Sequence, residues 1–203
     1  MKVSIIDYGM GNIHSIRNAL EYLGAETEYT SDPEKILDSD RIVLPGVGSY
    51  NHAMQTIVTR KLDEVIRMAV NAKKIPILGI CLGMQLLGMS GTEDGYIGGL
   101  GLFNGKVEKF KLDSYALKVP HIGFNEVEAP LNSILYKGIS DIHDFYFVHS
   151  YRMITEEKTG VGYCVYGEKF VASFEADNIF GTQFHPEKSQ TNGLRLLKNF
   201  LVQ

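Results

Sequence analysis

The sequence predicts an α/β fold, with a mostly parallel central sheet, helices on both of its faces and a partly antiparallel extension. Short apolar runs alternate with segments of helical periodicity as far as Gly88, which is typical of a parallel sheet covered on both faces. From about Gly91 to Gly167, glycines, tyrosines and alternating polar and apolar residues replace the helical periods and indicate antiparallel strands. An amphipathic segment then closes the chain.

The first elements follow from local patterns. Residues 3–6 form an apolar run that predicts a strand, and apolar residues then recur at helical spacing from Ile13 to Leu23 until Gly24 ends the pattern. In such a parallel sheet a site is expected at the carboxyl ends of the strands. Further elements are predicted at residues 25–30 (a strand), 31–34 (a helix start) and 41–44 (a strand).

The centre of the chain is residues 75–85, an apolar run that changes at Cys81 into a helix start. Helical spacing over residues 62–69 predicts a helix before this run, and residues 84–87 continue the helix after it. Residues 189–202 carry leucines on one face and predict the closing helix.

Length and composition limit the classes of function. At 203 residues the chain is expected to form a single domain, residues 1–203. A net charge of -4 and a pI near 5.9 argue against binding to nucleic acid. The start of the chain does not resemble a signal peptide, and no apolar stretch approaches the ~18 residues of a membrane span. The two cysteines form no paired framework, so a cytoplasmic protein is expected.

The turn at Cys81 has the pattern of a nucleophile elbow, because Gly79 and Gly83 lie two residues before and two residues after the sulfur. A sulfur at the start of a helix is expected to be reactive, since free N–H groups and the helix dipole favour the thiolate. The alternative is a small buried hydrophobe, which is what most free cysteines are. We interpret the second cysteine, Cys164, in this way, as strand packing.

A histidine and a carboxylate decide between these interpretations of Cys81. His185 and Glu187 flank Pro186, and the residue before a proline is held in an extended conformation. In an extended chain residues two apart point the same way, so the carboxylate can hold the tautomer of the imidazole. Cys81, His185 and Glu187 are therefore predicted to form a catalytic triad.

These residues resemble the class I glutamine amidotransferases, whose triad is Cys, His and Glu in that order. Within that family the chain is similar to the glutaminase subunits of imidazole glycerol phosphate synthases, and the likeness covers its whole length. It departs from them at Phe124, where tryptophan is usual, and at Ile122, where methionine is frequent. The resemblance is carried by the motifs at residues 7–12 (DYGMGN), 44–48 (LPGVG), 79–85 (GICLGMQ), 120–125 (PHIGFN) and 183–189 (QFHPEKS).

Acyl chemistry at a cysteine needs two N–H donors for the developing oxyanion. The amide that follows the nucleophile, that of Leu82, is the first candidate. The loop of Gly46, Val47 and Gly48 is the candidate for the second, and the sequence leaves open which of its amides faces inward.

The family implies further residues that bind glutamine, and without the resemblance each would be interpreted as an ordinary surface or strand residue. Glu93 is expected to pair with the substrate ammonium group and Gln85 to hydrogen-bond the substrate. His149, Ser150 and Tyr151 match further glutamine-binding positions. No cofactor and no metal ion are expected.

The resemblance also implies a partner, because nothing in the chain resembles a site for a substrate that accepts ammonia. In the family a (β/α)8 cyclase subunit forms a heterodimer with the glutaminase and uses the ammonia to make imidazole glycerol phosphate and an aminoimidazole carboxamide ribotide (AICAR) in histidine biosynthesis. By resemblance, Asn12, His121 and Lys188 are expected at or near the subunit contact. For Lys188 the alternative is a solvated surface charge.

Three other functions stay open from the sequence, and one of them is a hydrolase that acts on peptides or other γ-glutamyl compounds. The departures at Ile122 and Phe124 are compatible with a paralogous glutaminase that supplies ammonia for nitrogen transfer in surface-sugar synthesis. A non-catalytic relative with the same fold is the second alternative, and the intact Cys81, His185 and Glu187 argue against it.

Overall fold

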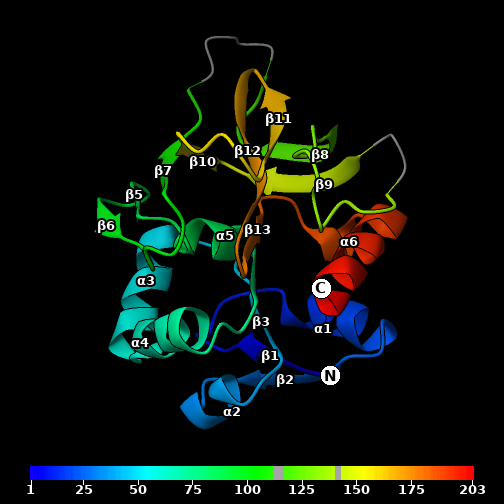
Figure 1. Ribbon diagram of the computed structural model, residues 1–203. Helices are drawn as coiled ribbons and strands as arrows, with labels where there is room; N and C mark the ends of the chain where they lie inside the picture. Colours follow the sequence, from blue (N-terminus) through cyan, green and yellow to red (C-terminus); the bar gives the residue numbers. More distant parts are fainter. Residues whose placement is uncertain (112–116, 140–142) are drawn as a thin grey trace.

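A long mixed sheet organises the computed structural model, which describes residues 1–111, 117–139 and 143–203 (Figure 1). One half of the sheet is parallel, and the carboxyl ends of its strands lie at one edge. Its strand order is β2 (Glu26–Thr30), β1 (Lys2–Ile6), β3 (Arg41–Leu44), β4 (Ile77–Ile80) and β13 (Ile179–Thr182).

The other half of the sheet is mostly antiparallel and begins at β12, which pairs with β13. A separate antiparallel pair, β8 (His121–Glu126) with β9 (Asp144–His149), lies beside it. This antiparallel half contains β12 (Glu168–Ala176), β11 (Val161–Tyr166), β10 (Tyr151–Thr155), β7 (Gly105–Lys109), β5 (Ser90–Gly91) and β6 (Ile97–Gly98).

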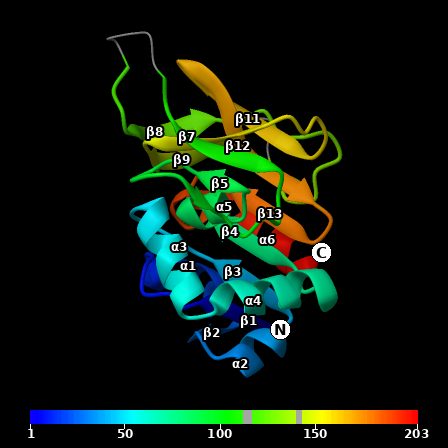
Figure 2. The same ribbon diagram turned by 90° about the vertical axis from the view of Figure 1, so that its left-hand side faces the viewer.

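Helices cover both faces of the parallel half (Figures 1 and 2). On one face α1 (Ile13–Tyr22) and α6 (Gln190–Val202) share an apolar core with the sheet. On the opposite face α3 (Tyr50–Thr59) and α4 (Leu62–Arg67) share a second core with it. A short helix, α2 (Pro33–Leu37), and a π-helical turn, Met68–Ala72, complete this second layer.

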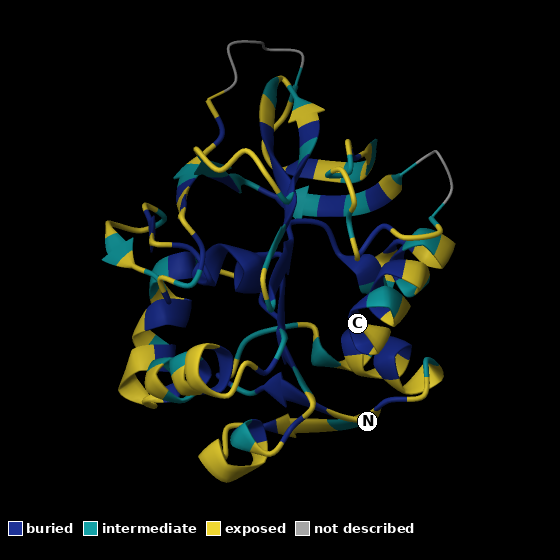
Figure 3. Ribbon diagram, in the orientation of Figure 1, coloured by how far each residue is buried: buried dark blue, intermediate teal, exposed yellow. Residues whose placement is uncertain are grey.

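The strands divide their side chains between the two cores because neighbouring residues of a strand point to opposite faces. In β1, Ile5 packs with the α1 and α6 core, and Ile6 packs with the α3 and α4 core. Ile77 and Leu78 of β4 are divided in the same way. Figure 3 shows these central strands almost entirely buried. A shift of one residue in register would exchange the two sets, so this pattern fixes the position of β4 and of the residue that follows it.

The predicted fold class is confirmed, and several element boundaries agree closely. The predicted strand at residues 41–44 is β3, and the helix start at residues 31–34 is α2, whose Asp32 side chain caps the Glu34 N–H at 2.9 Å. The helix predicted to continue from Cys81 is short, because α5 contains only Leu82–Leu86. Helix α3 was not among the predicted elements.

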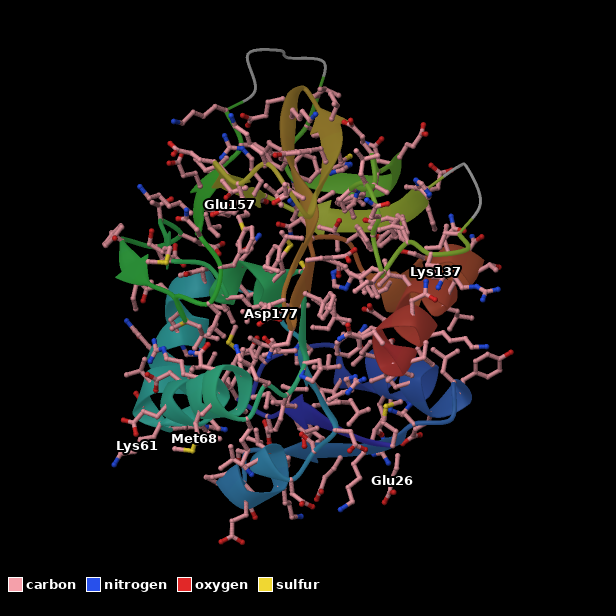
Figure 4. The ribbon with its side chains drawn as sticks, in the orientation of Figure 1. Glu26, Lys61, Met68, Lys137, Glu157 and Asp177 are labelled. Atoms are coloured by element: carbon pink, nitrogen blue, oxygen red, sulfur yellow. The ribbon has the colours of Figure 1, made fainter. Side chains whose placement is uncertain are left out.

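Exposed side chains project from the outer surface of the molecule. Lys61, Met68 and Glu26 project outward from the lower part of the molecule in Figure 4, and all three are exposed. Along the described ranges, no helix has both the length and the apolar character that crossing a membrane requires.

Candidate active site

Cys81 lies at the carboxyl end of the central strand β4, where the chain turns sharply into α5. Its φ of 54° is in the left-handed region, which costs a non-glycine residue about 1–3 kcal/mol. Two backbone hydrogen bonds hold this conformation: Cys81 N–H donates to the Thr182 carbonyl at 2.7 Å, and Gln85 N–H donates to the Cys81 carbonyl at 3.2 Å. The turn is therefore a strained elbow that its neighbours stabilise.

The two glycines of the elbow are required by close backbone approaches, as predicted. A Cβ at Gly79 would lie 2.7 Å from the backbone nitrogen of Met84. A Cβ at Gly83 would overlap the carbonyl oxygen of Leu44, which is backbone and cannot move aside. The elbow therefore packs directly against β3 and places the sulfur at the edge where the parallel strands end.

His185 and Glu187 lie on the segment that follows β13, beside the elbow. His185 is extended, as predicted, but Pro186–Lys188 forms a 3₁₀ turn, so the expectation of a fully extended His-Pro-Glu segment is wrong. The turn nevertheless brings the two side chains together, with His185 Nδ1 and Glu187 Oε1 2.8 Å apart. Both side chains are buried. Because a carboxylate can only accept, Nδ1 carries a proton and Nε2 is left free for chemistry.

The electrostatics of His185 favour its protonated form. Burial alone would lower the pKa of His185, but the interactions of the ring with the nearby Cys81 sulfur and the Glu187 carboxylate outweigh burial and raise this pKa to about 10. Its Nε2 is buried and has no hydrogen-bond partner among the described residues. His185 is thus a charged or readily charged imidazole, held by a carboxylate, with one nitrogen available.

Cys81 and His185 line the same cavity, of about 510 Å³. That volume is within the range of small-molecule sites. Gly46 and Glu187 are not among the residues that line the cavity, and Ser49, Pro120 and Val148 line it although the sequence did not single them out. The other predicted residues on the walls are Val47, Gly48, Leu82, Gln85, Glu93, His149, Ser150 and Tyr151.

The loop at residues 45–48 is held in place by Tyr8. The Tyr8 hydroxyl, fully buried, donates to the Pro45 carbonyl at 2.7 Å. Gly46 is packed so tightly that a Cβ there would lie 2.9 Å from the Gly83 nitrogen. Gly48 has a φ of 107°, which glycine adopts without strain. Val47 and Gly48 are thereby held near Leu82 on the cavity wall, and their oxyanion role stays a prediction.

Glu93 presents a restrained carboxylate to the cavity. Its Oε2 accepts the backbone N–H of Tyr50, the first residue of α3, at 2.9 Å. Burial raises the pKa of Glu93, although this hydrogen bond opposes the shift. A carboxylate fixed in this way at a cavity wall can accept hydrogen bonds from an ammonium group.

Gln85 is buried and has a definite orientation. Its amide nitrogen donates to the Tyr151 carbonyl at 3.0 Å and to Oε1 of Gln183 at 2.8 Å. The Nε2 atom of Gln183 in turn lies 3.7 Å from the Cys81 sulfur. Gln183 belongs to the motif at residues 183–189, but no sequence signal pointed to a role for its side chain.

His149 and His121 form a second network on the same carbonyl. His149 Nδ1 lies 2.8 Å from the Tyr151 oxygen, an acceptor, so this nitrogen carries the proton. His149 Nε2 must then accept from His121 Nδ1, 3.1 Å away, and His121 Nε2 can accept from Asn125 at 3.4 Å. Burial lowers the pKa of His149 to about 3 and that of His121 to about 4. Both imidazoles are neutral.

The residues expected at a partner contact have different environments. Asn12 and Lys188 are exposed, and the Lys188 ammonium lies 5.8 Å from the centre of the Tyr146 ring. The side chain of His121 is instead buried and stacks on Tyr166, and its place at or near a partner contact stays a prediction. The same strand exposes Ile122 and Phe124.

Comparison with known proteins identifies the family. Residues 4–203 match the model of the family described as glutamine amidotransferase class-I. This chain belongs to the class-I glutamine amidotransferase family. Its elbow cysteine is therefore found in a family of amidotransferase enzymes, which agrees with the resemblance that the sequence carried.

Curated relatives refine the position of this amidotransferase. It is 45% identical over 198 residues to the imidazole glycerol phosphate synthase subunit HisH 1 of Campylobacter jejuni, covering 98% of each chain. It is also 45% identical to the HisH subunit of Acinetobacter baylyi, covering 98% of this chain and 97% of the relative. The HisH subunit of Methanosarcina acetivorans is 45% identical over 98% of each chain.

Solved structures share the fold at lower identity. PurLQS from Thermotoga maritima superposes with a TM-score of 0.72 at 21% identity, covering 98% of this amidotransferase and 97% of that chain. A glutamine amidotransferase from the same organism gives a TM-score of 0.66 at 17% identity, with 99% of this chain and 82% of that chain covered. These structures establish the mixed α/β architecture of the amidotransferase fold.

Proposed function

We propose that this chain is a single glutaminase domain that hydrolyses L-glutamine to glutamate and ammonia. The ammonia passes to a (β/α)8 cyclase subunit, which makes imidazole glycerol phosphate and AICAR in histidine biosynthesis in the cytoplasm. The observation that carries the proposal is the elbow cysteine, which shares a 510 Å³ cavity with a carboxylate-held imidazole. The family and the HisH names of the relatives support the same reaction.

The first half of the reaction forms a thioester. The Cys81 thiolate attacks the carboxamide carbon of glutamine, and negative charge develops on the amide oxygen. Leu82, Val47 and Gly48 line the cavity, which supports the proposal that the Leu82 N–H and an amide of this loop stabilise the oxyanion. Protonated His185 gives its Nε2 proton to the leaving nitrogen, so ammonia departs and a glutamyl thioester remains.

The second half reverses the proton transfers. Neutral His185 takes a proton from water, and the resulting hydroxide attacks the thioester carbon. Collapse of the second oxyanion releases glutamate and restores the thiolate beside the imidazolium. Glu187 stabilises the imidazolium in both halves through the 2.8 Å contact with Nδ1. The balance is glutamine and water to glutamate and ammonia.

The ends of the substrate meet groups of suitable charge. The Glu93 carboxylate accepts from the α-ammonium group, while its bond to Tyr50 keeps it in place. The Gln85 side chain lies closer to the elbow and accepts an N–H of the substrate through its oxygen, because its nitrogen is occupied. Ser150 and Tyr151 form the wall between these contacts.

The proposed partner surface is the exposed face of the β8–β9 pair together with the nearby Lys188. Ile122 and Phe124 are exposed there, and Phe124 makes an edge contact with Tyr146, 5.7 Å between ring centres. Lys188 extends the row beyond Tyr146. An apolar pair flanked by a cation suits a protein partner with an apolar patch and a carboxylate beside it.

The test measures ammonia release from glutamine by the chain alone, with a candidate cyclase, and with the cyclase and its nucleotide ligand. We expect turnover to rise as each component is added, and Cys81→Ala to lose it. Equal rates for the wild type and Cys81→Ala in the complete mixture would reject the glutaminase function and favour a non-catalytic relative.

One observation favours a different partner as the recipient of the ammonia. The two departures from the usual sequence, Ile122 and Phe124, both lie on the exposed face where a partner would bind. A paralogous glutaminase that serves surface-sugar nitrogen transfer would differ at such a surface. Co-purification discriminates the two: capture of a sugar-modifying amidotransferase system, without turnover of the histidine-pathway substrate, would replace the cyclase as partner.

A further inference from the structure

The Gln183 side chain is buried between the nucleophile and the substrate-facing amide of Gln85. Its side chain has no exposed surface, and its backbone continues the strand by donating to the Ala172 carbonyl at 2.8 Å. A primary amide in such a position must find partners for its donors and its acceptor, because an unpaired buried polar group is costly. Its partners are the Gln85 side-chain nitrogen and the Cys81 sulfur, and both belong to the proposed active site.

The orientation of both amides follows from a single acceptor. The Tyr151 carbonyl oxygen can only accept, so the Gln85 atom 3.0 Å away is the nitrogen. The same nitrogen lies 2.8 Å from Gln183, so the Gln183 atom facing it is the oxygen. The Gln183 nitrogen then points at the Cys81 sulfur, at 3.7 Å. Flipping Gln183 would place two nitrogens together and aim an oxygen at the thiolate.

A second network fixes the same carbonyl from the other side. His149 Nδ1 also donates to the Tyr151 oxygen, at 2.8 Å, and uses its second lone pair. The carbonyl is therefore fully occupied and held by two buried side chains. This leaves the Gln85 nitrogen with both hydrogens engaged and only its oxygen free at the cavity wall.

We propose that Gln183 is a positioning residue of the glutaminase site, which donates an N–H to the Cys81 thiolate and locks Gln85 as a hydrogen-bond acceptor for the substrate. The proposal rests on the proposed function for the identity of the substrate. Its first part concerns the sulfur alone and holds for any electrophile. In the neutral thiol the sulfur lies 3.9 Å from the Val148 carbonyl, which can accept from S–H but not stabilise a thiolate. Gln183 supplies the donor that the charged form needs.

The fixed orientation of Gln85 determines whether the site prefers hydrogen-bond donors or acceptors on the ligand. A free oxygen on the wall accepts from the N–H groups of glutamine but repels a carboxylate in the same place. The site consequently favours a ligand that donates hydrogen bonds to Gln85 and disfavours one that offers only acceptors. Gln183 maintains this preference because, without its oxygen, the Gln85 amide is free to rotate and present a donor.

The test compares Gln183→Met, which has a similar length and no donor, with Gln183→Glu, which keeps the shape and the acceptor for Gln85. The matched control is Thr182→Val, because Thr182 is the adjacent residue, fully buried, and its hydroxyl has no hydrogen-bond partner among the described residues. Alkylation of Cys81 by iodoacetamide is measured against pH, with the modified peptide identified by mass spectrometry. Folding of each variant is checked by circular dichroism.

We expect the midpoint of the alkylation profile to rise by about one pH unit in Gln183→Met and further in Gln183→Glu. Thr182→Val should keep the wild-type midpoint. With a partner present, kcat/KM for glutamine should fall about tenfold in Gln183→Met, which corresponds to the loss of one hydrogen bond to a charged group. An unchanged midpoint in either folded Gln183 variant would overturn the proposal.

The alkylation arm separates this inference from the proposed function. A shifted midpoint without glutamine turnover in any partner mixture would support the contact with the sulfur and reject the glutaminase function. Glutamine turnover with an unshifted midpoint would support the glutaminase function and reject the contact between Gln183 and the sulfur. If Gln183→Met does not fold, Gln183→Glu alone decides, since it is nearly isosteric with the native residue.

Discussion

The cavity holds two buried histidines whose pKa values are shifted in opposite directions. His185 is paired with a carboxylate and a sulfur, and its pKa is raised to about 10. His149 is paired with a carbonyl and a neutral imidazole, and burial lowers its pKa to about 3. The same side chain in one pocket is therefore a proton donor in one place and an uncharged structural group in the other. The neighbours of each ring determine the difference: Cys81 and Glu187 beside His185, and a carbonyl and a neutral imidazole beside His149.

The comparison explains why only one of these histidines can serve as acid and base. His185 has a free Nε2, and its Nδ1 donates to Glu187. Both nitrogens of His149 are occupied, by the Tyr151 carbonyl and by His121. His149 could accept a proton only by breaking the contact with His121. Substitutions of each histidine should therefore differ in kind as well as in size.

The largest effect is expected for His185→Asn, which should lower glutamine turnover by about a thousandfold or more, since the proton donor and acceptor are both lost. Ammonia release in the complete partner mixture measures it. His52→Asn, at an exposed position on α3, is the matched control and should keep wild-type turnover. A loss of less than tenfold for His185→Asn would remove His185 from the chemistry.

Glu187→Gln should have a smaller effect, of about a hundredfold, because the ring keeps a neighbour but loses the charge that stabilises the imidazolium. The pKa of His185 should then fall. Activity needs protonated His185, so the alkaline limb of the kcat/KM profile, near pH 10 in the wild type, should move to lower pH. An alkaline limb at the same pH in the variant would contradict the assigned pairing.

The smallest effect is expected for His149→Asn, and it concerns stability more than chemistry. Above pH 6.5, His149 is neutral in both the folded and the unfolded state. As the pH falls below 6.5 the unfolded chain binds a proton that the folded chain, with a pKa of about 3, does not, so the wild type loses stability.

Urea unfolding at pH 6.5 and pH 4.5 tests this expectation. Between pH 6.5 and pH 4.5 the free energy of unfolding should fall by about 2 kcal/mol less in His149→Asn than in the wild type. This is the amount that proton linkage gives for one group over that interval. The midpoints of the kcat/KM profile of His149→Asn should match the wild type. A displaced activity midpoint would mean that His149 titrates during turnover, and the contrast with His185 would fail.

Local sequence patterns were sufficient to predict the parallel half of the fold and the elbow. The glycine spacing around Cys81 reflects two close backbone approaches in the structure, one between Gly79 and Met84 and one between Gly83 and Leu44. Helix α3 was not predicted because residues 50–59 include several weak helix formers. Packing of its apolar face against the core stabilises the helix, and the local sequence does not show this packing.

Contacts between distant residues were beyond reach of the sequence patterns. Gln183 is 98 residues from Gln85, and His121 is 28 residues from His149. Periodicity tells which face of a strand a side chain takes, but not which side chain of another element it meets there. The family resemblance implied that His121 lies at or near a partner contact, but no local pattern showed that the pairing of β8 with β9 directs its side chain to the interior.

The left-handed backbone at residue 81 has a consequence for how the sequence could change. Glycine would adopt this φ without the penalty that a side chain incurs, so Cys81→Gly relieves strain while it removes the sulfur. Folding stability and the thiol therefore make opposite demands at this position, and Cys81 reduces the first in order to supply the second.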